Sequence, residues 1–116
     1  MKGHYFAQIS PNETFLASSR IFQQSIILFD IRTGQVVREV SGHRATVRQI
    51  EFSADERLMA SLDMDGELRL WDVNGNKDVT KMIPDIADID SIGFRGSDTL
   101  TVSADGSTRA FDLSGV

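Results

Sequence analysis

The sequence has no cysteine and only two histidines, two prolines and one tryptophan among its 116 residues. The absence of cysteine excludes a disulfide scaffold, a thiolate nucleophile and every cysteine-containing zinc site. Two histidines are too few for a zinc site unless carboxylates complete it, and no glycine-rich phosphate loop is present. We therefore expect neither a metal nor a cofactor.

Long apolar runs are also missing. The longest strictly apolar run covers residues 26–29, whereas a membrane-spanning helix needs about 20 residues, and the apolar stretch at residues 5–7 is too short for a signal peptide. Basic residues are in the minority, because 12 Lys and Arg stand against 17 Asp and Glu. A net charge of −5 argues against a general binder of nucleic acid or membrane surfaces. We therefore expect a cytoplasmic protein that binds neither.

What the sequence does contain is an internal repeat. Three segments end in an aromatic residue, an aspartate and an aliphatic residue, and their aspartates are Asp30, Asp72 and Asp112. A small turn pair follows each segment, and an Asp-Gly pair precedes the last two, at residues 65–66 and 105–106. A period of about 40 residues is typical of architectures in which each repeat packs on its neighbours.

Short β-prone runs separated by Gly, Asn, Asp and Ser indicate an all-β fold, and no stretch has the stripe of an amphipathic helix. Both faces of the strands are apolar, since Leu68 and Leu70 point one way and Trp71 the other. Each sheet therefore needs a cover on both sides, which radially packed four-stranded sheets provide. The pattern predicts eleven short antiparallel strands, at residues 5–9, 15–19, 25–31, 35–40, 46–52, 58–62, 67–73, 78–82, 89–94, 99–103 and 107–113.

The middle unit has the most specific motif of the chain. Gly42-His43 is followed 28 residues later by Trp71-Asp72, with Phe52-Ser53, Ala60-Ser61 and Asp65-Gly66 between them. This unit resembles a WD40 repeat, the blade of a β-propeller. The flanking units resemble it through Phe29-Asp30 and Phe111-Asp112, although the third has Pro84-Asp85 in place of the Gly-His pair. The resemblance implies one domain, residues 1–116, that forms a partial propeller of about three blades: about 4–41, about 42–83, and about 84–116 without an outer strand.

The resemblance further implies that four polar side chains of the middle unit form one buried hydrogen-bonded row: Trp71, Ser61, His43 and Asp65. Leaving such groups unpaired between blades would cost about 1–3 kcal/mol each, and in the implied row every donor has an acceptor. The third unit keeps Thr101, Asp105 and Phe111 but has no indole or imidazole. We expect its row to be absent or reduced.

Two chemical functions are compatible with these residue types. Ser61, His43 and Asp65 could form a hydrolase triad, but no glycine-flanked nucleophile turn is present and the repeat already accounts for the three residues. The acidic cluster at residues 78, 85, 88 and 90 could bind Ca²⁺, but it lacks the glycine turn and terminal glutamate of the usual calcium loop. A solvated loop explains the cluster better, and we expect no enzyme activity.

The resemblance also implies a surface for partners. In WD-repeat proteins, the positions beside the turn aspartate and just after Gly-His face the narrow end that holds partners. The residues at such positions in this sequence are Arg44, Thr46, Met64, Ile86, Asp88 and Ala104. Their side chains either contact a partner or merely cap the ends of the blades, and the sequence does not separate the two.

We expect a WD40-repeat scaffold that binds proteins or peptides and catalyses nothing itself. The alternatives are a regulatory or sensor fragment of a larger multidomain protein, or a propeller enzyme, which would need a cofactor motif or an acid–base pair. Propellers close with four to eight blades, so we also expect further blades from a longer chain or from a second copy. An open arc would expose apolar side chains at both ends, Phe6 and Ile9 at one and Ile92, Phe94 and Ala110 at the other.

Overall fold

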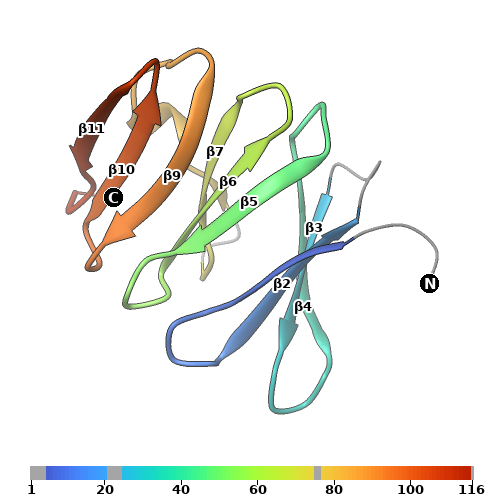
Figure 1. Cartoon of the computed structure of the whole chain (residues 1–116). Helices are drawn as coiled ribbons and strands as arrows, with labels where there is room; N and C mark the ends of the chain where they lie inside the picture. Colours follow the sequence, from blue (N-terminus) through green and yellow to red (C-terminus); the bar gives the residue numbers. More distant parts are fainter. Residues whose placement is uncertain (1–4, 21–24, 75–76, 116) are drawn as a thin grey trace.

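The computed structural model describes residues 5–20, 25–74 and 77–115. They form three antiparallel sheets that lie side by side (Figure 1). The first has the order β1 (Tyr5–Ile9), β2 (Phe15–Arg20), β3 (Ser25–Asp30), β4 (Val36–Ser41), and the second β5 (Val47–Phe52), β6 (Leu58–Asp63), β7 (Leu68–Asp72), β8 (Lys77–Asp78). The third contains β9 (Ile89–Arg95), β10 (Thr99–Ala104) and β11 (Ser107–Asp112). The predicted all-β fold is confirmed.

The second sheet lies between the other two (Figure 1), and β5 contacts both β1 and β9. Its strand β6 is buried at all six positions, because a neighbouring sheet covers each of its faces. Trp71 packs in the core shared with the first sheet, whereas Leu68 and Leu70 pack in the core shared with the third. This confirms the prediction of two apolar faces, which distinguishes stacked sheets from a sheet with one solvated side.

The outer strand of the second sheet is shorter than predicted. A strand was expected at residues 78–82, but β8 ends at Asp78 and Thr80–Met82 form a 3₁₀ helix. The Val79 backbone N–H still donates to the Leu70 carbonyl at 2.8 Å, but a side chain supplies the other bond: the Thr80 hydroxyl accepts a hydrogen bond from the backbone N–H of Leu70 at 2.9 Å. The Asp78 carboxylate accepts one from the Thr80 backbone N–H at 2.8 Å and thereby turns the chain. The prediction was wrong because threonine and aspartate side chains compete with the backbone for such bonds.

One buried carboxylate connects the first two sheets. Glu56, in the turn between β5 and β6, is 8 % exposed and has a positive φ of 62°. It accepts hydrogen bonds from the Asn12 backbone N–H at 2.9 Å, from the Thr14 hydroxyl at 2.7 Å and from the Ser10 hydroxyl. Burial alone would raise the pKa of the Glu56 carboxyl, but these bonds outweigh it and hold the pKa below its ordinary 4.5.

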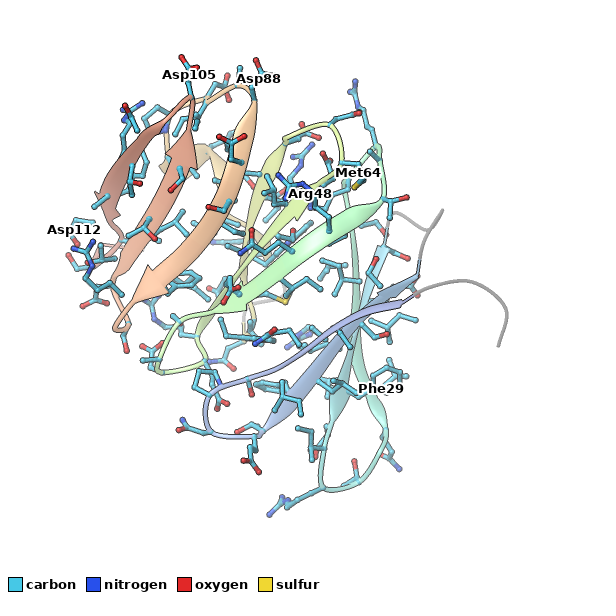
Figure 2. All side chains as sticks on the ribbon, in the orientation of Figure 1. Phe29, Arg48, Met64, Asp88, Asp105 and Asp112 are labelled. Atoms are coloured by element: carbon cyan, nitrogen blue, oxygen red, sulfur yellow. The ribbon has the colours of Figure 1, made fainter. Side chains whose placement is uncertain are left out.

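The two outward faces of the arc differ in polarity. Ile9, Leu16, Phe29 and Val36 pair across the four strands of the first sheet, and Ile9 and Val36 are 53 % and 59 % exposed. Figure 2 shows Phe29 on the side of this sheet that faces away from the second sheet. The expected exposure of Ile9 is confirmed, whereas the side chain of Phe6 lies outside the described residues.

At the other end, the expected exposure was wrong for Ile92 and Phe94, whereas Ala110 is exposed as expected. Ile92 is 6 % exposed and lies opposite Val102 in the core against the second sheet, and Phe94 packs partly against the same core. Alternation along the strands therefore turns their apolar side chains inward. The outward face has mainly hydroxyl and other small side chains, all partly or fully exposed: Thr99, Thr101, Ser103, Thr108 and Ala110.

Candidate functional site

A row of buried polar side chains crosses the second sheet on the face toward the first. The Trp71 indole N–H donates to the Ser61 hydroxyl at 3.0 Å, and Ser61 lies 2.6 Å from Nε2 of His43. Nδ1 of His43 lies 2.8 Å from a carboxylate oxygen of Asp63. A neutral imidazole with its proton on Nδ1 gives every donor in the row an acceptor. The structure thus brings together Trp71, Ser61 and His43 as the sequence predicted.

The carboxylate of the row is Asp63, and the prediction of Asp65 was wrong. Asp63 is the last residue of β6 and is fully buried. Its side chain projects from the same side of the sheet as that of Ser61, two positions earlier. Its second oxygen accepts the backbone N–H groups of Asp65 at 2.9 Å and Glu67 at 3.0 Å. Asp65 itself lies exposed in the turn. The period of two along a strand, which places Asp63 beside Ser61, was the signal that could have found it.

Burial lowers the pKa of His43 below its ordinary 6.5. The hydrogen bond and the charge of Asp63 act in the opposite direction, while the Arg69 cation adds to the lowering. A pKa below 6.5 keeps the imidazole neutral at physiological pH, in agreement with the assignment of its single proton to Nδ1.

The same geometry argues against chemistry at the row. Ser61 is 0 % exposed and the His43 side chain 1 % exposed, so no substrate carbonyl can approach the hydroxyl. Among the described residues, one group of three brings potential metal-ligand atoms within 4.8 Å of one another, namely His43, Asp63 and Glu67. Both nitrogens of His43 are already occupied by Asp63 and Ser61. The row joins the loop before β5 to strands β6 and β7 of the second sheet.

The third sheet has a different arrangement at these positions. Val102 lies opposite Ile92 as Ser61 lies opposite Ile50, so Val102, and not Thr101, takes the place of Ser61. The Thr101 hydroxyl donates to the Gly93 carbonyl at 3.2 Å instead. The turn residue Asp105 is exposed, with a positive φ of 54°. An apolar contact thus replaces the polar row in this sheet.

The predicted partner residues gather at one end of the sheets, which we call the rim. The backbone N–H of Met64 donates to the carbonyl of Thr46 at 2.8 Å, which joins the β6–β7 turn to the loop before β5. A Cβ on Gly66 would lie 3.2 Å from Cα of Asp88, so the same turn touches the loop before β9. Ala104 pairs with Ile89, immediately after that loop. Figure 2 shows Met64, Asp88 and Asp105 along this end.

The rim residues differ in exposure. Met64 is 64 % exposed, and Arg44 and Asp88 are also exposed, whereas Thr46 and Ala104 are half-buried. Ile86 packs partly against the core between the second and third sheets. Ile86 therefore contributes to packing as well as to the surface, while Met64, Arg44 and Asp88 are open to contact.

Residues 34–72 match the family described as WD domain, G-beta repeat. The chain is 42% identical over 59 residues to a CCR4-associated factor 4 homolog of Candida glabrata, an alignment that covers 51% of this chain and 10% of the relative. It is 28% identical over 104 residues to periodic tryptophan protein 2 of Arabidopsis thaliana, covering 88% of this chain and 12% of the relative. The chain thus spans about a tenth of the length of these curated relatives.

Solved structures share the fold. The crystal structure of RRP9 WD40 repeats matches with a TM-score of 0.80 and 15% identity, over 99% of this chain and 37% of that chain. The β-propeller domain of Myceliophteria thermophila Cps50 (Swd1) matches with a TM-score of 0.72 and 18% identity, over 93% of this chain and 35% of that chain. The chain is therefore built of WD40-type β-propeller blades, and its residues 34–72 form a WD40 repeat.

Proposed function

We propose that this chain is a scaffold that binds a protein or peptide partner at the rim and catalyses no reaction itself. The exposure of Met64 is the observation that carries the proposal. At 64 %, it exceeds that of every other large hydrophobic side chain that the structure describes as exposed. An exposed, flexible thioether on a rigid turn suits contact with a partner, whereas a mere cap on the blade would bury it.

The family and the buried row support a non-catalytic role. WD40 repeats generally serve as protein-interaction modules, and the chain shares their fold. The residues that could imitate a hydrolase triad are sealed between two blades, and their hydrogen bonds are already made within the row. A scaffold needs only such rigid blades and an accessible surface.

Two further parts of the proposal concern the surroundings of the chain. We expect further blades to cover the apolar outward face of the first blade, where Leu16 and Phe29 line a hollow of about 290 Å³. We also keep the cytoplasmic location as a prediction. Within the described part of the chain, no helix has the length and apolar character needed to cross a membrane.

Substitutions at the rim test the proposal once a partner has been identified by affinity capture. Arg44→Glu and Met64→Asp should each weaken binding of the purified partner about tenfold or more, because few contacts dominate an interface. The matched control is Arg95→Glu, which repeats the charge reversal of Arg44→Glu on an exposed residue where β9 ends, at the opposite end of the sheets.

Circular dichroism and thermal melting should show that all three variants keep the fold, because the altered side chains lie on the surface. Unchanged affinity of both rim variants, or an equal loss in Arg95→Glu, would show that the partner binds elsewhere. Turnover of a substrate by the purified chain would contradict the non-catalytic role.

A further inference from the structure

A groove runs beside the rim between the second and third blades. It has a volume of about 930 Å³ and lies between β7 with its preceding turn and the segment at residues 78–89. Four of its lining residues belong to or pack against the core between these blades and give it an apolar floor: Leu68, Ile83, Ile86 and Ile89. The size is within the range of pockets that bind ligands, so an extended segment of a partner could occupy it.

The charges around this groove are unbalanced. The Arg69 guanidinium lies 3.4 Å from the Glu67 carboxylate and 3.3 Å from that of Asp78, so one positive charge is shared between two carboxylates. Three further carboxylates line the groove, are exposed and form no ion pair within the described residues: Asp65, Asp85 and Asp88. Lys81 is the remaining cation of the lining, so the groove has an excess of negative charge.

The carboxylates are too dispersed for a single metal ion. Among the described residues, Asp78, Asp85, Asp88 and Asp90 do not form a group of three whose oxygen atoms lie within 4.8 Å of one another. Calcium requires several oxygen ligands at about 2.3–2.6 Å. Separated negative charges above an apolar floor instead match a chain of separated positive charges on aliphatic stems, such as lysine side chains.

We propose that this groove binds an extended cationic segment of a protein partner. This inference rests on the proposed scaffold function and specifies the partner. The methylene stems of lysine or arginine lie over Ile83 and Ile86, and the charged head groups reach Asp85 and Asp88. Alternate side chains of an extended peptide point the same way, so every second residue of the segment is basic.

Fluorescence anisotropy with labelled peptides tests the proposal on the whole chain. The probe is a short peptide of alternating lysine and alanine, and the comparison is the same peptide with glutamate in place of lysine. Only the lysine peptide should bind, and high salt should weaken the binding because exposed charges are screened. Replacing both Asp85 and Asp88 by Asn should weaken it about tenfold at low salt. Asparagine tolerates the positive φ of 56° at residue 88.

A matched double variant, Asp98→Asn with Asp112→Asn, removes the same charge from the opposite end of the third blade, where Figure 2 shows Asp112. It should leave peptide binding within about twofold, since charges beyond a Debye length of about 10 Å are largely screened. Equal binding of the two peptides, or equal losses in the two double variants, would overturn the proposal. Competition by calcium alone would favour a cation site instead. The effect of Met64→Asp and Arg44→Glu on partner binding is measured independently of these peptide experiments. The proposed scaffold function and the proposed groove can therefore be refuted separately.

Discussion

Replacing Asp63 by asparagine should destabilise the fold, whereas the same replacement of Asp65 should not. Asp63 is buried and accepts three hydrogen bonds, from Nδ1 of His43 and from the backbone N–H groups of Asp65 and Glu67. An asparagine at residue 63 keeps one oxygen for the two backbone donors, so its amide N–H₂ must face His43. The imidazole then has to move its proton to Nε2, where it meets the Ser61 hydroxyl.

That change leaves one donor without its acceptor inside the core. The Ser61 hydroxyl already accepts the Trp71 indole N–H, and its own proton loses Nε2 of His43 as partner. An unsatisfied buried donor costs about 1–3 kcal/mol, and hydrogen bonds to a charged group contribute more than those to a neutral one. We therefore expect the free energy of unfolding to fall by about 3 kcal/mol in Asp63→Asn, and by at most about 0.5 kcal/mol in Asp65→Asn.

Urea denaturation followed by tryptophan fluorescence measures this difference. Trp71 is the single tryptophan and is 4 % exposed, so its emission reports on the loss of the blade that contains the row. With a slope of about 2 kcal/mol per molar urea, the midpoint of Asp63→Asn should lie about 1.5 M below that of the unaltered chain. Equal midpoints for the two variants would refute the assignment of Asp63 to the row.

Trp71→Phe should lower the free energy of unfolding by about 2 kcal/mol, because Ser61 loses its donor and the blade loses packing. Circular dichroism during urea denaturation measures this free energy, and a decrease below about 0.5 kcal/mol would contradict the role of the indole. Glu56→Gln should cost about 2 kcal/mol at neutral pH, since one of the donors from the first blade then meets an amide N–H₂. Because the folded pKa of Glu56 is lowered, this carboxylate contributes fully above its ordinary 4.5 and the contribution is lost as pH falls through the folded value. The urea midpoints of Glu56→Gln and of the unaltered chain should therefore converge in acid. A constant difference between the two midpoints would contradict the role of the Glu56 carboxylate in joining the first two blades.

Most strands were predictable because turn residues mark where each one ends. The exception, at residues 78–82, fails because Thr80 satisfies the Leu70 backbone with its side chain, which a pattern of apolar residues does not reveal. The link that the Glu56 carboxylate makes between the first two sheets was not predictable either. Its partners Ser10, Asn12 and Thr14 lie more than forty residues away, so nothing local marks this glutamate as buried.

The prediction of Asp65 failed because the β6–β7 turn and the β10–β11 turn, which the repeat aligns, differ in length. The repeat aligns the Asp-Gly pairs at residues 65–66 and 105–106. In the structure the β6–β7 turn occupies residues 64–66, closed by the Asp63 backbone N–H donating to the Glu67 carbonyl at 3.1 Å. The β10–β11 turn occupies residues 105–106. Strand register, and not the turn motif, therefore decides which residue reaches the row.

The polarity of the two outward faces also bears on how the arc is completed. A second copy stacked head to tail would place the hydroxyl of Thr101 and its neighbours against the apolar outward face formed by Leu16 and Phe29. The Thr101 hydroxyl donates to the Gly93 carbonyl, and the Ser103 and Thr108 hydroxyls bond to each other, so they would escape the penalty for unpartnered groups. Such small side chains would nevertheless bury little apolar surface against Leu16 and Phe29. Within the chain, the corresponding interface instead sets Ile26 and Leu28 against Met59 and Trp71. The apolar face of the first blade thus suits a blade of similar aliphatic composition better than it suits the third blade of another copy.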